Sequence, residues 1–536
     1  MGVSKRYSQG WLALCYAFGP LASHALAIIT WGGTGNNYTT PPGGVGNYEI
    51  DFGWELATAI SPTVMVTATH IGSGSSSTVT IGSSTYNVEL AATLDDLALW
   101  QFVPNQPGAV FSSYAPLYTG DSEVGMSLVD VGRGVARGSA ITGGWNWGSY
   151  TGQVSWGTNT VSAVDTDNQL GLSGAFGGDY LQYDFDNNPS DPNECIIGND
   201  DSGGGVFVDN NGVYQLAGVN SLVDTVLNSS GQTVNAALYD EQGYYEESGS
   251  GSLMQITSPY PESSYATRIA SRMNLIGVVD GAISPANAAN YPIFNDGNFS
   301  VYSSMTTGAI IGGAAVTLGG PNTPNTKPTL QIAPNSGASN LSSLTLDTGS
   351  TLDVTNNKII ITGVSATEQS AILQWLASGY NDGAWNGTGI ISSTAAASGG
   401  RCGVGYASGN ITSGLSSGEV EIAYTLYGDT NLEGVVNAVD FGVLAANLDK
   451  SVTGGWQMGD FTYSGVVNSI DFGLFAQNYG SSIKGVSAGV TSADWAALDA
   501  FAVANGLSSE VPEPAASGML AAGTLTLFAR RRRRRC

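Results

Sequence analysis

Three separate stretches of the chain carry a serine, a histidine and an aspartate that could act together in acyl transfer. Ser202 lies between two acidic residues and three glycines, just before a β-branched run. His70 ends the apolar run Val64–Thr69, and Asp96 begins another apolar run. A histidine can activate a serine as a nucleophile, and a carboxylate can hold that histidine in one tautomer. All three residues are expected at strand ends, where catalytic side chains often lie.

Each stretch also has a plainer interpretation. Clusters of Gly, Ser and Asp are usually ordinary turns, and this chain has 74 glycines. A lone histidine is more often a hydrogen-bonded structural residue than a catalyst. The chain has only two histidines, however, and His24 lies in the expected export signal. A carboxylate such as Asp96 is costly to bury unless something pairs with it, and His70 is a suitable partner.

The three stretches resemble the chymotrypsin/trypsin-like serine proteases. Thr67–His70 is similar to that family's T-A-A-H, Asp96–Leu99 is similar to its D-I-A-L, and Asp201–Gly204 matches its D-S-G-G. The order histidine, aspartate, serine is also the family's order. The resemblance covers about residues 28–280. It implies a mainly β fold in which two six-stranded β-barrels pack together.

The resemblance also implies a role for each residue. Ser202 would be the nucleophile, His70 the general base, and Asp96 the residue that orients the imidazole. The backbone N–H groups of Asp200 and Ser202 would form the oxyanion hole. The residues that would line the substrate cleft are Ile196, Ser221, Leu222 and Val223. The implied activity is that of a serine endopeptidase, which hydrolyses peptide bonds of a protein or peptide substrate through an acyl-enzyme and needs no cofactor for catalysis.

The chain departs from this family at several positions. The family has glycine where this chain has Asp200, proline where it has Gly205, and cysteine where it has Ile71. A long acid-rich insert lies between Ser221 and Tyr265. These departures keep a second hypothesis open, namely a catalytically inactive protease-fold surface protein that acts as a binding or structural module. A narrower alternative is a protease that acts only on its own chain.

The composition bounds the rest of the chain. Its 536 residues allow several domains, and sparse charge with frequent turn residues between short apolar runs favours β structure. Two such runs around the turn Asp209–Gly212 predict a β-hairpin directly after Ser202.

The net charge of −26 argues against a nucleic-acid partner. Residues 281–425 are expected to form a β-rich connector module, with a helix that begins at the capping box Ser365–Glu368.

Residues 426–482 contain two copies of one loop pattern, each followed by an apolar helical face. Oxygen-bearing side chains recur in each copy at the spacing of a calcium-binding loop, with a glycine at the sharp turn. The expected ligands are Asp429, Asn431, Glu433, Val435, Asn437 and Asp440 in the first copy, and Asp460, Thr462, Ser464, Val466, Asn468 and Asp471 in the second. Val435 and Val466 would contribute their backbone carbonyls. The copies resemble dockerin type I domains, which implies bound calcium, weaker at the second loop, and a cohesin-like partner. The alternative is a calcium-stapled spacer.

The two ends of the chain have the pattern of export and sorting signals. Residues 1–27 combine a basic start, a short apolar stretch and an A-x-A cleavage site, which is typical of a signal peptide. A lipid anchor on Cys15 is the alternative. Cleavage would make Ile28 the new N-terminus, and the resemblance implies that such a terminus can pair with Asp201.

The segment 483–510 is expected to be a linker to the C-terminal signal. Residues 511–536 combine a Pro-Glu-Pro motif, a short apolar stretch and a run of arginines, and they resemble the PEP-CTERM sorting signal. The signal-peptide pattern implies processing by signal peptidase at the N-terminal end, and this resemblance implies processing by an exosortase-type enzyme at the other end. It also implies transient membrane insertion of the C-terminal segment and a secreted, extracellular or cell-surface location.

Overall fold

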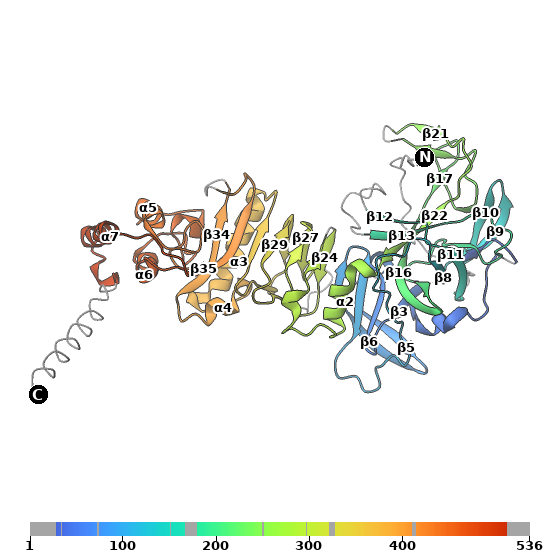
Figure 1. Ribbon diagram of the computed structural model, residues 1–536, viewed down its shortest axis with the longest axis horizontal. Helices are drawn as coiled ribbons and strands as arrows, with labels where there is room; N and C mark the ends of the chain where they lie inside the picture. The colour runs from blue at the N-terminus through green and yellow to red at the C-terminus, as the bar shows by residue number, and fades with distance from the viewer. Residues whose placement is uncertain are drawn as a thin grey trace, which may run out of the picture. The chain divides into compact units, whose positions relative to one another are not determined.

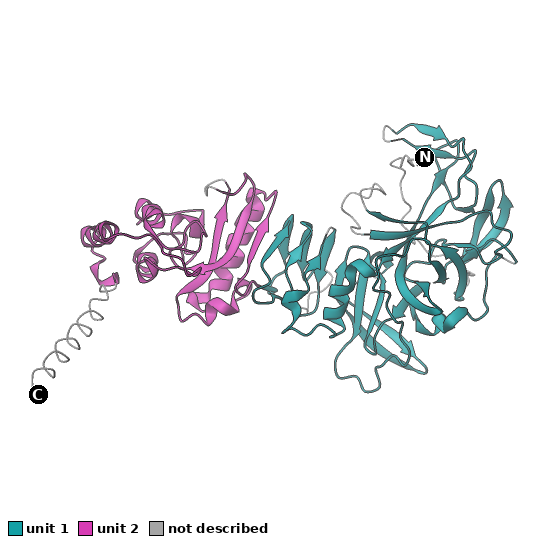
Figure 2. Ribbon diagram, in the orientation of Figure 1, with its two compact units in different colours: residues 1–352 teal, residues 353–536 magenta. Residues whose placement is uncertain are grey.

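The computed structural model describes residues 28–33, 35–71, 74–150, 152–166, 179–248, 251–295, 297–320, 327–409 and 414–511. The expected signal peptide at 1–27 and all but the first residue of the sorting signal at 511–536 lie outside these residues. The described chain is mainly β, which confirms the coarse fold class predicted from composition. It divides into two compact units, Met1–Leu352 and Asp353–Cys536 (Figure 2). None of the described helices combines the length and apolar character that a bilayer span requires.

A large sheet in the first unit carries the strands next to His70 and Asp96. Its strand order is β2-β3-β4-β7-β6-β24-β27-β30, with β5 paired to β6. The strands are β2 (Glu49–Phe52), β3 (Glu55–Ala59), β4 (Val64–Ala68), β5 (Ser76–Ile81), β6 (Ser84–Leu94), β7 (Leu97–Phe102), β24 (Asn298–Val301), β27 (Ala315–Leu318) and β30 (Ser343–Leu346). All five residues of β4 are buried, as its continuous apolar run predicts. Met65 and Trp100 belong to the hydrophobic cluster on one side of this sheet.

A second sheet of the same unit carries the strand that follows Ser202. Its order is β11-β8-β15-β16-β22-β13-β12. The strands are β8 (Ser127–Gly132), β11 (Ser155–Thr160), β12 (Ala163–Thr166), β13 (Asp179–Asp184), β15 (Gly205–Asn210), β16 (Val213–Val223) and β22 (Ser263–Arg268). The predicted hairpin is confirmed, because β15 and β16 pair antiparallel. Asn211 and Gly212 both have positive φ, 57° and 86°, as a tight hairpin turn requires.

Smaller elements surround these two sheets. They are β1 (Ile29–Thr30) paired with β14 (Cys195–Ile196); β9 (Val135–Ile141), β10 (Gly144–Tyr150) and β19 (Ala236–Leu238) in one sheet; β17 (Val226–Leu227), β18 (Thr233–Val234), β20 (Tyr245–Glu247) and β21 (Leu253–Gln255) in another; and helix α2 (Met273–Val279). The acid-rich insert between Ser221 and Tyr265 contributes five of these smaller elements, β17 to β21. Cys195 and Cys402 are both buried free thiols.

The strands after residue 280 continue the first sheet, whereas the sequence predicted a separate module from 281 to 425. β24 pairs antiparallel with β6, and β27 and β30 then add in parallel (Figure 1). Parallel pairs also join β23 (Ile293–Phe294) to β26 (Ile310–Ile311) and β25 (Met305–Thr307) to β28 (Thr329–Ile332). Successive turns of the chain therefore stack as the rungs of a short parallel coil, which buries Phe299 and Val316. Two more strands of this part are β29 (Ala338–Leu341) and β31 (Thr351–Asp353).

The second unit combines a small sheet with helices. β32 (Lys358–Ile361) pairs with β35 (Val420–Leu426), which pairs with β34 (Cys402–Ser408). Helix α3 (Ala366–Tyr380) begins at the predicted capping box of Ser365 and Glu368. The remaining elements are β33 (Gly389–Ile391), α4 (Ser393–Ala396), α5 (Ala438–Asn447), α6 (Ser469–Asn478) and α7 (Ser492–Ala504).

The segment 483–510, expected as a linker, contains helix α7. Phe501 of α7 lies edge-on to Phe441 with ring centroids 5.3 Å apart, and it stacks on Phe472 at 6.0 Å. Trp495, also on α7, lies edge-on to Tyr479 with ring centroids 4.9 Å apart. The sequence interpretation missed this helix because its apolar residues do not gather on one narrow stripe. α7 thus completes the core of the two repeated loops.

Candidate active site

His70 lies between Ser202 and Asp96. Its Nε2 is 2.8 Å from Ser202 Oγ, and its Nδ1 is 2.9 Å from both carboxylate oxygens of Asp96. The backbone N–H of His70 also donates to Asp96 Oδ1, at 3.2 Å. The structure therefore brings together all three residues that the sequence singled out for acyl transfer, in a hydrogen-bonded chain from hydroxyl to carboxylate.

Strand pairing positions His70 beside Asp96. β4 and β7 pair with Ala68 opposite Leu97, which sets the end of one strand against the start of the other. Beyond this pair, the N–H of Thr69 donates to the carbonyl of Asp96 at 3.0 Å. The side chain of Asp96 is fully buried and that of His70 is only 4% exposed. The pairing thus holds the imidazole against a carboxylate that water does not reach.

Glycine makes the turn after Ser202 tight enough to reach the first sheet. Gly203 has φ +84°, and a Cβ there would lie 2.2 Å from the carbonyl oxygen of Leu56 and 2.3 Å from Thr67 Oγ1. Its N–H donates to the carbonyl of Asn220 at 2.9 Å. Only glycine fits such a close approach. The turn that carries Ser202 is consequently held directly against β3 and β4.

Asp201 anchors this turn from below. Its carboxylate accepts hydrogen bonds from the N–H groups of Gly134, at 2.6 Å, and Gly198, at 2.8 Å. The residue is 1% exposed, and burial raises the pKa of its carboxyl group well above the usual value. Asp201 therefore ties the turn that carries Ser202 to the segments at Gly134 and Gly198.

The turn around Asp200 leaves two backbone N–H groups without a backbone acceptor. Asp200 has φ +68°, a region in which aspartate is one of the few residues other than glycine to be found. Within the described residues, the N–H groups of Asp201, Gly203 and Gly204 donate to backbone carbonyls, whereas those of Asp200 and Ser202 have no acceptor. These two donors are the pair expected from the sequence for an oxyanion hole. Burial raises the pKa of the Asp200 carboxyl group, whose Oδ1 accepts from Asn199.

Charges near His70 determine its basicity. Burial by itself lowers the pKa of His70, but the charge and hydrogen bond of Asp96, together with the charge of Glu55, raise it above the usual value. A histidine with a raised pKa is a stronger base toward the Ser202 hydroxyl at neutral pH. The imidazolium that forms when it takes the proton is stabilised by the same carboxylate.

Glu55 is a part of the site that the sequence interpretation missed. It begins β3 and is half-buried, and burial raises the pKa of its carboxyl group to about 8, with Asp200 and Asp96 adding to the shift and His70 opposing it. The only signal in the sequence is an acidic residue at the start of an apolar run, the same signal that identified Asp96.

A buried polar cluster behind the Ser202 turn was also missed. Asp130 on β8 accepts from Asn220 Nδ2 and from the hydroxyl of Tyr183, each at 2.7 Å. Asn220 in turn connects to the backbone of Gly203 and Gly204. Burial raises the pKa of Asp130 to about 6. These residues come from three strands that lie far apart in the sequence, so no local pattern links them.

The predicted cleft residues lie deeper than expected. Ser221 is fully buried, and its hydroxyl donates to Asp96 Oδ2, so it belongs with the carboxylate that contacts His70. Ile196, Leu222 and Val223 are fully buried too. Ile196 and Val223 pack in the hydrophobic cluster of the second sheet. Their apolar side chains point to the inner face of their strands, which places both in the core rather than on a cleft wall.

The two repeated loops of the second unit have matching internal geometry. Asp429 accepts from the N–H groups of Glu433 and Gly434, and Asp460 accepts from the equivalent N–H groups of Ser464 and Gly465. The aspartates that close the loops, Asp440 and Asp471, likewise cap equivalent N–H groups at the start of α5 and α6. The sequence repeat is thus a structural repeat.

The chemistry of these loops fits a calcium ion. Asp429 and Asp440 are both fully buried, and burial raises the pKa of the first to about 7 and of the second to about 6. Two buried carboxylates facing one another are compensated when a cation lies between them. Within the described residues, no group of three or more His, Cys, Asp and Glu side chains lies close enough to hold a metal ion. The remaining oxygens would come from Asn, Thr, Ser and backbone groups, which calcium accepts.

A comparison of the chain with protein-family models found no match, and a comparison with curated proteins found none. What the site does is therefore inferred from its geometry.

Proposed function

We propose that this chain is an exported trypsin-like serine endopeptidase, and that its two large sheets belong to the double β-barrel of that family. The observation that carries the proposal is the hydrogen-bonded chain from Ser202 Oγ through His70 to Asp96. Two backbone N–H groups, those of Asp200 and of Ser202 itself, have no acceptor in the described residues. A nucleophile, a base, an orienting acid and two anion donors are the groups that acyl transfer requires.

The proposed reaction follows from these contacts. Ser202 Oγ attacks the substrate carbonyl while His70 Nε2 takes its proton, and Asp96 stabilises the imidazolium. The N–H groups of Asp200 and Ser202 hold the negative oxygen of the tetrahedral intermediate, and each such donor is worth about 10²- to 10³-fold in rate. His70 then gives the proton to the leaving amine, which releases the first product and leaves an acyl-enzyme. Water repeats the sequence to release the acid.

The location of Ile28 supports activation by cleavage at the expected signal site. Ile28 is fully buried. A Cβ on Gly132 would lie 2.7 Å from Ile28 Cδ1 and 2.2 Å from Asp201 Oδ1, so both residues lie against the same glycine. A new N-terminal ammonium at Ile28 would neutralise the buried carboxylate of Asp201 and stabilise the turn that carries Ser202.

A second candidate function is a binding or structural module without catalysis. Two observations favour it. The carboxylate of Asp200 adjoins the proposed oxyanion hole, where a negative charge opposes the developing oxyanion. Ser202 is only 1% exposed, so a protein substrate reaches it only after the site opens.

A fluorophosphonate probe separates the two candidates. The full chain is treated with the probe in the presence of calcium, and the labelled residue is identified by mass spectrometry. Labelling at Ser202 that is lost in His70→Ala and in Ser202→Ala supports the protease. A folded protein that takes no label supports the module, and labelling regained in Asp200→Gly would identify Asp200 as the cause. Cleavage of the chain itself, with no cleavage of added casein, would indicate a protease restricted to its own chain.

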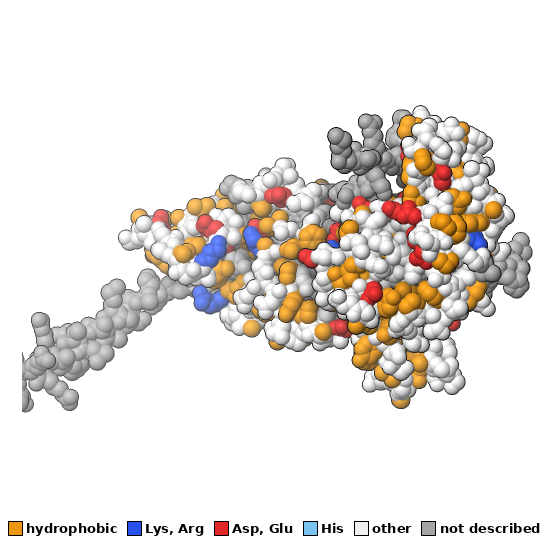
Figure 3. Space-filling model, turned by 45° about the vertical axis from the view of Figure 1, so that its right-hand side comes forward, with side chains coloured by type: hydrophobic (Ala, Val, Ile, Leu, Met, Phe, Trp, Pro, Cys, Tyr) orange, Lys and Arg blue, Asp and Glu red, His pale blue; other side chains and the backbone are white. Residues whose placement is uncertain are grey.

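The proposal extends to the other parts of the chain. Calcium bound in the two loops would neutralise their buried carboxylates and stiffen a dockerin-like module for a cohesin-like partner. The ends would be processed by signal peptidase and an exosortase-type enzyme, with transient membrane insertion of the C-terminal segment, and would direct the protein to the cell surface or outside the cell. On the face shown in Figure 3, acidic patches lie on the first unit and basic side chains are few, which fits a protein substrate better than nucleic acid.

A further inference from the structure

The turn that carries Asp96 is held through its neighbour, Asp95. Asp95 has φ +57° and is 6% exposed. Its N–H donates to the carbonyl of Asn298 at 3.1 Å, and its own carbonyl accepts from Thr69 Oγ1 at 3.1 Å. Its carboxylate accepts from Arg272 Nη2 at 2.8 Å. The backbone and the side chain of this one residue are thus fixed by three different parts of the first unit.

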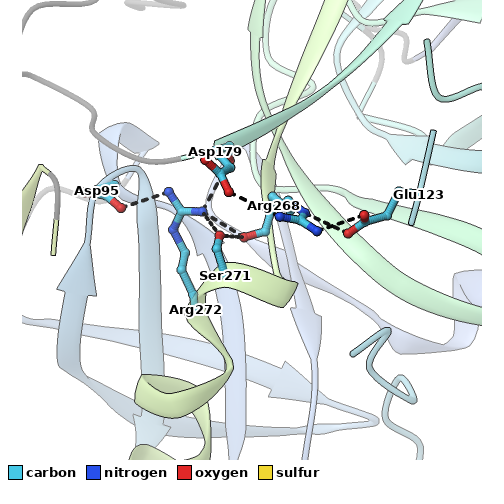
Figure 4. A network of polar contacts seen from close by, with 6 residues as sticks. All are labelled: Asp95, Glu123, Asp179, Arg268, Ser271 and Arg272. Carbon is cyan, nitrogen blue, oxygen red and sulfur yellow. Dashed lines mark hydrogen bonds and ion pairs between the residues drawn. The ribbon is translucent and has the colours of Figure 1, made fainter. Parts of the chain in front are cut away.

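Arg272 is itself fixed before it meets Asp95. It ends the short 3₁₀ turn Ala270–Arg272 and is 2% exposed. Its Nη1 donates to the carbonyl of Arg268 at 2.8 Å and to Ser271 Oγ at 3.1 Å (Figure 4). A guanidinium with several donors satisfied in a fixed fork loses little freedom when it pairs with a carboxylate. Asp95 therefore pairs with a guanidinium group whose position is already fixed by other hydrogen bonds.

The same network reaches the second sheet. Arg268, on β22, donates to both carboxylate oxygens of Glu123, at 2.7 and 2.9 Å, and to Asp179 at 3.2 Å (Figure 4). The Asp95–Arg272 pair thus joins the turn of the first sheet, which carries Asp96, to the sheet whose hairpin follows Ser202. Asp96 and Ser202 must keep one relative position for His70 to bridge them.

The strand after residue 280 holds the other side of the turn. β24 pairs with the end of β6, with Phe299 opposite Leu94, and the pairing continues into the Asp95–Asn298 bond. Phe299 is fully buried. The catalytic part of the chain therefore extends beyond 280 and includes the strand that grips the Asp96 turn.

We propose that Asp95 and Arg272 are positioning residues for Asp96, and that their buried ion pair, together with β24, sets the contact between Asp96 and His70. The catalytic consequence rests on the proposed serine-protease function. A buried ion pair adds little stability over an apolar pair, but it specifies one geometry. Asparagine tolerates positive φ as aspartate does, so Asp95→Asn keeps the turn conformation and removes the charge.

The first measurement reads the contact between His70 and Asp96 without any substrate. The chain has two histidines, so ¹⁵N-histidine labelling of the full chain in a His24→Gln background leaves His70 as the one labelled residue. The hydrogen-bonded Nδ1–H proton gives a downfield NMR signal, and a pH titration gives the pKa of His70. The double variant Asp95→Asn/Arg272→Gln removes both charges of the pair, so neither is left buried alone. We expect the Nδ1–H signal to weaken or move upfield and the pKa of His70 to fall.

The second measurement is turnover. A displaced Asp96 leaves the substrate cleft intact but disturbs the base, and small misplacements of catalytic groups reduce rates by up to about 100-fold. We expect kcat of the double variant to fall by about tenfold to 100-fold while KM changes less than about twofold. Glu262→Gln is the matched control, because Glu262 is a buried carboxylate of the same unit that accepts from the N–H of Leu238 and lies outside the Asp95–Arg272 network. This control should keep the wild-type His70 signal and kcat.

Each outcome decides between the alternatives. A folded double variant with the wild-type Nδ1–H signal and the wild-type pKa of His70 overturns the inference. If the double variant does not fold, Arg272→Lys decides, because lysine keeps the positive charge but lacks the planar guanidinium that holds it in one geometry. An unchanged Nδ1–H signal of His70 in this variant overturns the inference, and a shifted signal supports it. Failure of the wild-type chain to label at Ser202 would refute the protease alone, since the NMR result does not depend on activity.

Discussion

The hydroxyl of Ser221 donates a hydrogen bond to Oδ2 of Asp96 although the two residues lie 125 positions apart. Both side chains are fully buried. Asp96 therefore receives donors from two directions, His70 and Ser221, and the second donor comes from β16, the partner strand of the hairpin that follows Ser202. The two large sheets are thus joined at the carboxylate itself.

Removing this hydroxyl should slow the reaction. Hydrogen bonds to charged groups contribute about 1.5–3 kcal/mol, and only part of this is specific to the transition state. Ser221→Ala should therefore reduce the labelling rate at Ser202 by about fivefold to 30-fold. Ser264→Ala is the control, since Ser264 is equally buried and its Oγ accepts from Ile197 N–H. An equal loss of rate in both variants would attribute the effect to general loosening of the second sheet.

The pH dependence of labelling should report His70. The neutral form of His70 is the base, and the pKa of His70 is raised above 6.5. As the pH falls, His70 is therefore protonated, and the base is lost, at a pH higher than 6.5. The rate should drop about tenfold per pH unit below that midpoint. Asp96→Asn removes the anion that raises the pKa, so the remaining activity should be about 10⁴-fold lower with its midpoint shifted to lower pH. A wild-type midpoint at or below 6.5 would contradict this account of the site.

Removing the charge of Asp200 should accelerate acylation. Asn keeps the tolerance for the φ of +68° at this position but has no negative charge to oppose the oxyanion. Asp200→Asn should increase the labelling rate about threefold to tenfold, the range expected for one charge near a partly hydrated site. Asp209→Asn, near the end of β15, is a control that removes an acidic charge from the strand that follows Ser202. A lower rate in Asp200→Asn would mean that the carboxylate assists the turn.

Calcium should stabilise the second unit in a pH-dependent way. In the calcium-free loop the pKa values of Asp429 and Asp440 are raised to about 7 and about 6, so folding favours their protonated forms. That contribution to stability is present at pH 4 and is lost as pH rises through 6 to 7. Calcium requires both carboxylates ionised, so its binding should release protons and should weaken as pH falls from about 7 to 6. At 100 times its Kd it should add about 2.7 kcal/mol of stability.

Trp456, one of the 11 tryptophans of the chain, lies against the first loop and contributes to a fluorescence readout of this prediction. It is fully buried and its indole N–H donates to the carbonyl of Asp429 at 2.7 Å. Thermal unfolding followed by tryptophan fluorescence, with calcium or with a chelator, should therefore show the difference at pH 8 and little of it at pH 5. Asp440→Asn should abolish most of the calcium effect, whereas Asp382→Asn, outside the loops, should leave it intact. An Asp440→Asn variant with full calcium stabilisation would rule out this loop as the site.

The position of β24 predicts where the chain can be shortened. A chain ending at 280 loses Phe299, whose burial contributes about 3–5 kcal/mol, and exposes the edge of β6. It should be less soluble, unfold at a lower temperature and label poorly, whereas a chain ending at 352 should resemble the full chain. Calorimetry and probe labelling of the two truncations check this. Equal stability of both would restore the domain boundary expected from the sequence.

The sequence alone identified the triad, the hairpin after Ser202, the capping box of α3 and the loop repeat. The signals for these features are local. Each depends on residues within a few positions of one another, or on a short motif whose residue types suit one kind of chemistry. It also indicated β structure correctly, since turn residues between short apolar runs are a local signal. Its expectation of a linker at 483–510 and of a separate module from 281 was different from what the structure shows.

Only the tertiary structure decided which distant residues meet. Ser221 is the second hydrogen-bond donor to Asp96, and Arg272 is the partner of Asp95. The strand that pairs with the edge of β6 lies after residue 280. Ile196 and Val223 proved to be core residues for the same reason. Strand pairing between segments more than 100 residues apart depends on sheet order and burial, and an isolated arginine or serine carries no local mark of the carboxylate it will reach.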